Sequence, residues 1–237
     1  MKKFIFGVCL LFLSTSFSET RRTQVYDIGK SKEAPKFTQE TEITAGEGNM
    51  KNWNSKITDP SGKVVMTEKA KLKDGKIIYQ YIEQLQVNEA YELNVENGKA
   101  TFKTYKIVDG KAGPATETKT HDIDDRFMTG PMTEPVIQKN WAELMAGKVL
   151  KVEFGIFELS KLVSFEFKKI KEDAKTIQFE MKASNFFISA LLDPIQIEFD
   201  KERKTMTRFV GRIPLQQKVE TRWKAVDAEI IYSPTML

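Results

Sequence analysis

The sequence predicts a mainly β protein. We expect a curved antiparallel sheet of about ten strands, a half-barrel or barrel, with one mid-chain helix. Three observations support this fold class. Apolar residues recur at every second position in several segments, Asn-Gly and Asp-Gly pairs stand between such segments, and one stretch near the middle has apolar residues at helical spacing.

The alternation is clearest in the second half of the chain, where apolar and polar residues take turns. The apolar sets there are Val163, Phe165 and Phe167; Ile177, Phe179, Met181 and Ala183; Ile195, Ile197 and Phe199; and Val226, Ala228, Ile230 and Tyr232. Tyr91, Leu93 and Val95 follow the same rule earlier in the chain. A period of two predicts strands with one face in the core and one in water, which is typical of antiparallel sheets.

Tight turns are predicted between these segments. The turn signals lie at 59–62, 74–75, 96–98 and 109–110, and a charged turn of the same kind lies at 200–204. Asn-Gly and Asp-Gly supply the positive φ angles that short hairpins need. We therefore expect most strands to follow one another as a meander.

One helix is predicted between Thr133 and Gly147. Its apolar residues are Ile137, Trp141, Leu144 and Met145, a helical spacing. Thr133 is the expected N-cap and Gly147 the expected end. A sheet of this size must protect its edges, and curling around a helix is one solution. We expect this helix to cover the concave apolar face with Trp141 and Leu144.

Residues 185–192 have no clear period and are either helix or strand. They contain Phe186 and Phe187, beside Ile188 and before a Pro turn. Core packing is the first interpretation of this aromatic pair. The alternatives are the lip of a cavity, a lid, or a loop that contacts a membrane.

The N-terminus predicts a secretory signal peptide over residues 1–18. Lys2 and Lys3 form a basic start, residues 4–13 are largely apolar, and small residues precede an expected cleavage after Ser18. The apolar run is too short for a permanent membrane span. We expect residues 19–37 to be a loose polar arm and 38–237 a single β-rich domain, located in a bacterial periplasm or secreted.

Composition limits the function. The net charge is only +4, and acidic residues interleave with basic ones, so no nucleic-acid partner is expected. Cleavage after Ser18 would leave 35 basic against 33 acidic residues and remove Cys9, the only cysteine. The processed chain would then have no disulfide, no thiol nucleophile and no thiolate ligand for a metal.

No catalytic or metal-binding motif is found, and no cofactor is expected. His121 is the only histidine and lies before Asp122, Asp124 and Asp125. A zinc site needs more His or Cys ligands, and a calcium loop needs a Gly and a distal Glu. We interpret this run as a solvated acidic turn. Nucleophile-elbow and P-loop patterns are missing, and nothing recommends a particular carboxylate pair.

The C-terminal half resembles a group of uncharacterised exported bacterial β-rich proteins. The residues that carry the resemblance are Asn140, Trp141, Leu144, Gly147, Phe154, 193–195, Phe199 and 208–211. The predicted architecture is also similar to half-barrel carriers of lipids and lipoproteins, the LolA and LolB type. This second resemblance implies a fold and, by extension, a carrier role in the cell envelope.

The leading functional hypothesis is a periplasmic protein that binds a lipid, an acyl chain or a lipoprotein inside its curved sheet. The expected lining is Phe165, Phe179, Met181 and Phe199, with Trp141 and Leu144 on the lid. A structural or partner-binding module of the envelope with a filled core is the alternative. A hydrolase based on acidic residues and a small outer-membrane barrel are less favoured, because His is scarce and the wet faces carry many Lys and Glu.

Overall fold

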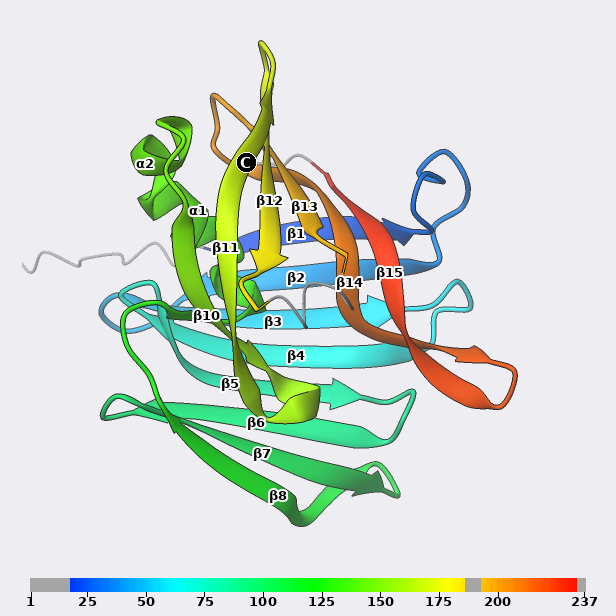
Figure 1. The fold of residues 1–237 in the computed structure, drawn as a ribbon. Coiled ribbons are helices and arrows are strands. Elements are labelled where there is room, and N and C mark those ends of the chain that lie inside the picture. Colours follow the sequence, from blue (N-terminus) through cyan, green and yellow to red (C-terminus); the bar gives the residue numbers. More distant parts are fainter. Residues whose placement is uncertain (1–17, 186–192, 234–237) are drawn as a thin grey trace, which may run out of the picture.

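A computed structural model describes residues 18–185 and 193–233. All described strands belong to one fifteen-stranded sheet, which curves but does not close (Figure 1). The sheet contains more strands than the ten that alternation predicts. Several additional strands, such as β1 and β8, carry mostly polar residues and give no apolar alternation.

The first half of the sheet consists of β1 to β8. Their bounds are β1 Ser18–Tyr26, β2 Phe37–Ala45, β3 Met50–Thr58, β4 Val64–Lys73, β5 Lys76–Gln84, β6 Glu89–Glu96, β7 Lys99–Val108 and β8 Lys111–Asp122. Each strand pairs with the next in antiparallel fashion. The predicted loose arm at 19–37 is wrong for its first part, because β1 lies in the middle of the sheet between β2 and β15. In β1, exposed residues alternate with partly or fully buried ones, and several of the latter, such as Arg21 and Thr23, are polar, which composition alone does not reveal.

The second half runs back from the far edge toward β1. Its strands are β9 Phe127–Met128, β10 Leu150–Ile156, β11 Lys161–Glu172, β12 Thr176–Ala183, β13 Ile195–Asp200, β14 Met206–Val219 and β15 Arg222–Tyr232, with a 3-10 turn, η2, at Phe157–Leu159. Only the pairing of β9 with β10 is parallel among the pairings described. In Figure 1 these strands run across those of the first half, so the two halves pack face to face.

The order of the strands explains why the sheet curves. The edges are β8 and β9, and they are joined by four residues, 123–126. A flat sheet of this size would separate its edges by roughly 67 Å, whereas that connection spans at most roughly 17 Å. The sheet must therefore curl until its two edges are close together.

The predicted turns occur where the sequence places them. Asp74, Asn97 and Asp109 have φ between 51° and 52°, and the glycine after each also has positive φ. Two successive positive φ angles are typical of the type I′ hairpin turn.

The predicted mid-chain helix is a bent helical segment, residues 130–145. It contains the 3-10 turn η1 Gly130–Met132, helix α1 Thr133–Lys139 and helix α2 Trp141–Met145. Asn140 separates the helices, and its side-chain amide donates to the carbonyl of Val136, which competes with continued helix. Thr133 is not the N-cap, because Met132 takes that position, but Gly147 follows α2 with φ +81° as expected.

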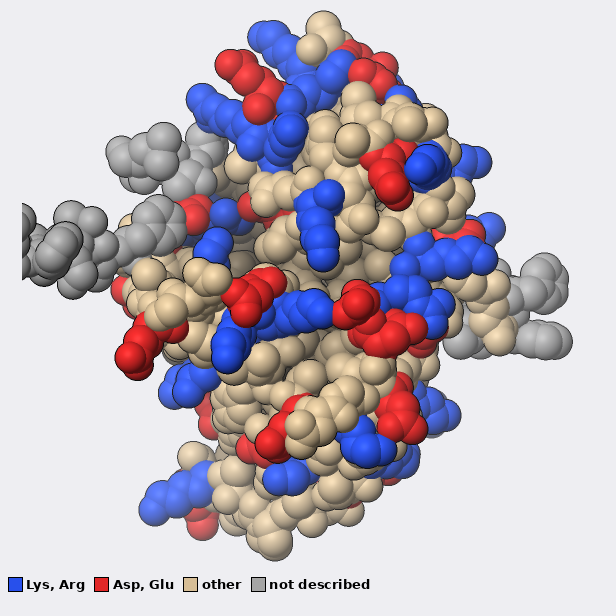
Figure 2. Space-filling view, turned by 90° about the vertical axis from the view of Figure 1, so that its left-hand side faces the viewer, with Lys and Arg blue, Asp and Glu red and all other residues tan. Residues whose placement is uncertain are grey.

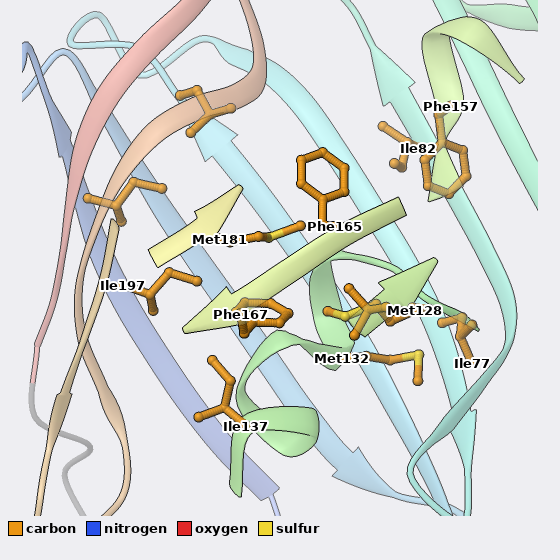
Figure 3. Packing of buried hydrophobic residues seen from close by; sticks show 14 of the residues in the cluster. Ile77, Ile82, Met128, Met132, Ile137, Phe157, Phe165, Phe167, Met181 and Ile197 are labelled. Atoms are coloured by element: carbon orange, nitrogen blue, oxygen red, sulfur yellow. The ribbon is translucent and has the colours of Figure 1, made fainter. Parts of the chain in front are cut away.

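The core lies between the two halves and under the helical segment. Figure 3 shows Ile77 and Ile82 of β5, Phe165 and Phe167 of β11, and Met132 and Ile137 of the helical segment converging on one cluster. The fully buried large side chains come from both halves, including Phe102, Phe167, Phe179 and Phe199. The predicted signal peptide falls almost entirely on residues 1–17, and Phe186 and Phe187 on residues 186–192, which lie outside the described residues.

Candidate ligand-binding site

The four residues predicted to line a cavity all lie on the inner face of the second half. Phe165 is on β11, Phe179 and Met181 are on β12, and Phe199 is on β13, and each is buried. Their neighbours in the chain, such as Glu166 and Glu180, are partly exposed. The alternation in the sequence therefore identified the inner wall correctly.

The helical segment rests on this wall through Trp141 and Leu144. The Trp141 ring contacts Phe179 and Phe199 edge-on, with ring centroids 5.8 Å apart in both cases, and Phe179 contacts Phe199 at the same distance. Leu144 is fully buried, whereas Trp141 is only partly buried. Edge-to-face aromatic contacts of this kind stabilise a packed cluster beyond the burial of area. Trp141 and Leu144 thus cover the concave face, as predicted.

The helical segment packs directly against the inner wall of β11, β12 and β13. The two best-formed hollows of the described surface have volumes of about 310 and 350 Å³ and lie elsewhere. The first is lined by a mixture of apolar and polar residues, including Pro194, Val210 and Asp227, and the second by polar residues such as Glu40 and Lys56. An apolar ligand at the predicted lining would therefore have to displace the helical segment.

Polar contacts hold the helical segment to the sheet from its other side. Glu134 of α1 is buried and accepts hydrogen bonds at 3.1 Å from both Nη1 and Nη2 of Arg21 on β1. It also accepts the backbone N–H of Met206 at 3.0 Å. Gln138 donates to the carbonyl of Lys204 at 2.8 Å. Paired and hydrogen-bonded in this way, the Glu134 carboxylate is compensated.

The inner face of the first half is partly polar, which sequence reasoning missed. Thr23, Thr41 and Ser55 are buried there, and Thr41 and Gln39 both donate to the hydroxyl of Ser55. Each of these residues lies two positions from a buried apolar one, for example Ser55 from Ile57. The spacing places these polar residues in register with apolar ones, but polar residues on exposed faces have the same spacing, so the pattern by itself does not mark them as buried.

Three side chains on adjacent strands form a distinct cluster, the Glu68 group: Trp53 of β3, Glu68 of β4 and Gln80 of β5. Trp53 and Gln80 lie opposite Ala70 in the register of the sheet, and Glu68 is two residues from Ala70 on the same face. Gln80 is 1% exposed and donates from Nε2 to Oε1 of Glu68. Burial raises the pKa of the Glu68 carboxyl to about 7, and Gln80 and Trp53 beside it oppose part of the rise.

One buried polar atom of the Glu68 group, Oε1 of Gln80, has no hydrogen-bond partner among the described residues. Each unsatisfied buried group of this kind costs about 1–3 kcal/mol. No described Lys or Arg forms an ion pair with Glu68. The Glu68 group is therefore a polar cluster of the described interior with an acceptor that remains unpaired and a carboxyl without a counter-charge.

The acidic turn after His121 is a surface feature. Asp122 pairs with Lys99, Asp124 with Arg126 and Asp125 with Lys76, and all three acidic residues are exposed. His121 Nε2 lies 2.9 Å from the carbonyl oxygen of Ser160, and its ring contacts Phe102. Over residues 18–185 and 193–233, no group of three or more His, Cys, Asp or Glu side chains is arranged to hold a metal ion.

The outer surface carries mixed charge. Figure 2 shows basic and acidic side chains interspersed over one face, with basic side chains gathered at the top, where the β11–β12 hairpin projects. Among the helices described, none is long and apolar enough to cross a bilayer.

Comparison with known proteins adds a distant structural likeness. No protein-family model matches the chain, and no curated protein sequence matches it. A solved structure, the beta-barrel-like protein of domain of unknown function DUF1849 from Brucella abortus, is similar over 92% of this chain and 95% of its own. The sequence identity is 6% and the TM-score 0.43.

Proposed function

We propose that this protein is an exported periplasmic carrier that binds the apolar part of a lipid, an acyl chain or a lipoprotein against the inner wall of β11, β12 and β13, without catalysing a reaction. The observation that carries the proposal is the way in which the helical segment packs on this inner wall. Its aromatic residue Trp141 lies on Phe179 and Phe199 but stays partly exposed, so this cover can detach without unpairing a strand. The signal-peptide pattern of residues 1–18 supports export.

The mechanism is replacement of one apolar cover by another. When the helical segment leaves, an acyl chain takes its place on Phe165, Phe179, Met181 and Phe199. Burying each CH₂ contributes about 0.8 kcal/mol, so a chain of about twelve carbons contributes about 10 kcal/mol before costs. Exposing Leu144 and the ring of Trp141 offsets a part of this gain. The LolA and LolB type of carrier, with its half-barrel, is the architecture that this proposal follows.

A second function, a partner-binding module of the envelope with a filled core, is favoured by the tight packing of the same residues. The edge strand β8 is the exposed edge that a partner would meet. Pro114 and the two lysines of β8, Lys111 and Lys119, discourage pairing with another strand, however. We therefore rank this function below the carrier.

Native mass spectrometry tests the carrier directly. The full chain is expressed in a bacterium, and the processed protein is purified without detergent and mixed with dodecanoate or dodecanol. We expect cleavage after Ser18 and a stoichiometric complex. Trp141→Ala should take up the ligand faster, whereas Trp223→Ala, a change at an exposed tryptophan, should not. Absence of any bound or extractable amphiphile would reject the carrier and leave the filled-core module.

A further inference from the structure

The Glu68 group has the chemistry of a small cation site. Glu68 and the orphaned Oε1 of Gln80 are two hydrogen-bond acceptors on neighbouring strands. Ala70, between Trp53 and Gln80 in the register, contributes only a methyl group, so the larger side chains stand around a short one. Trp53 and Glu68 are not fully buried, so a part of the group remains accessible.

The described neighbours of Glu68 provide no positive charge. Its contacts are with the neutral side chains of Gln80 and Trp53. The residues directly opposite it in the sheet are Ser55 and Ile82, which are also neutral. Arg21, on the same face two strands beyond Ser55, is engaged with Glu19 and Glu134. A desolvated carboxyl in such surroundings favours a ligand that brings its own charge.

We propose that the Glu68 group binds the protonated amino group of a ligand. A primary ammonium donates to Glu68 and to Oε1 of Gln80, and so satisfies both acceptors. A hydroxyl would reach Gln80 and Trp53 but would leave the carboxylate without a counter-charge, so an amine fits better. This inference rests on the proposed carrier function only for the apolar part of the ligand.

Matched amphiphiles distinguish the contribution of the amino group to binding from that of the apolar chain. Binding of dodecylamine, dodecanol and the short probe ethylamine is measured by calorimetry at pH 8 on the processed protein. We expect dodecylamine to bind at least tenfold more tightly than dodecanol. Glu68→Gln should abolish this preference while leaving the affinity for dodecanol unchanged, and thermal unfolding checks that the variant is folded. Glu40→Gln, at an exposed position on β2, should behave like the unchanged protein.

The outcomes distinguish the two proposals. If dodecanol binds and dodecylamine has no advantage, or if its advantage survives Glu68→Gln, the amine site is rejected and the carrier stands. If ethylamine binds in a Glu68-dependent manner but no long chain does, the amine site stands and the carrier is rejected. If neither amine binds, the group holds only water, and the inference is wrong.

Discussion

At the scale of the residue, burial changes the acid–base properties of an ordinary polar side chain. Glu68 lies on the inward face of β4, between Met66 and Ala70. The residues opposite it on the adjacent strands, Ser55 and Ile82, are buried. The Glu68 carboxyl holds its proton up to a pH near 7 for that reason. The same residue on the outer face would be one more solvated glutamate. Its chemistry thus comes from its surroundings and not from its type.

The raised pKa of Glu68 predicts a pH-dependent stability. Because the native state retains the proton from about pH 4.5 to about 7, where the unfolded state loses it, stability should fall as pH rises through that window. The loss due to this group is about 3 kcal/mol at most. Relative to the unchanged protein, Glu68→Gln should gain this amount in urea unfolding at pH 8 and little at pH 4.5. Parallel pH profiles for the two proteins would contradict the assignment.

A second residue-scale prediction concerns Gly211 on β14. Its φ is +151°, and a Cβ there would lie 2.7 Å from Cγ1 of Ile195 and 3.2 Å from the Ile195 Cα. Gly211→Ala should therefore destabilise the protein by about 1–3 kcal/mol, since the backbone of β13 must shift. Gly130→Ala, where a Cβ meets no atom within 4 Å, is the control and should change stability little. Equal effects at both glycines would exclude the close approach as the cause.

At the scale of the element, the helical segment is joined to the sheet by a few side chains and not by a ladder. Met132, Ile137, Trp141 and Leu144 are among its apolar contacts, and Glu134 provides its ion pair with the sheet. The strands of the same protein, in contrast, are fixed by backbone hydrogen bonds, on both sides for every strand except the edge strands β8 and β9. The helical segment is therefore the described element most able to open locally.

Trp141→Ala tests this view of the helical segment. Loss of the ring from Phe179 and Phe199 should cost about 2–4 kcal/mol in unfolding free energy. Hydrogen exchange of the amides in residues 133–145 should accelerate more than that of β12. Trp223→Ala should stay within about 0.5 kcal/mol, because Trp223 is 42% exposed. Uniform acceleration over the whole chain would mean that the helical segment does not open separately.

At the scale of the whole molecule, the two edges of the sheet meet without pairing. The β8 side meets the turn before β11 where His121 Nε2 contacts the carbonyl of Ser160 and where the ring of Phe102 on β7 contacts the ring of Phe157. The connection 123–126 is bonded to both sides, through Ile123 N–H to Gly98 and through the Arg126 carbonyl to Glu153. We call these contacts the seam. They keep the sheet curved although no pairing of strands closes it.

His121→Ala should loosen the seam. It removes the partner of a carbonyl and a ring contact, which we expect to cost about 1–2 kcal/mol. Amides of β8 should exchange faster, while those of β14 and β15 should not. The control is Thr118→Ala, an exposed position on the same strand. If β8 exchanges at the same rate in both variants, His121 does not hold the seam.

The sequence by itself determined the β class, the hairpin turns, the inner face of β11 to β13 and the end of the helical segment at Gly147. These are local properties: an Asn-Gly pair sets its own φ angles, and alternating apolar residues identify a buried face. Only the tertiary structure decided that Thr41 and Ser55 are buried, that Glu68 is partly buried on the same face, that β1 is central, and that β8 meets the β10–β11 connection. Those features depend on which strands become neighbours when the sheet curls. Because a polar inward-facing strand has the same local pattern as an exposed one, the sequence alone does not distinguish them.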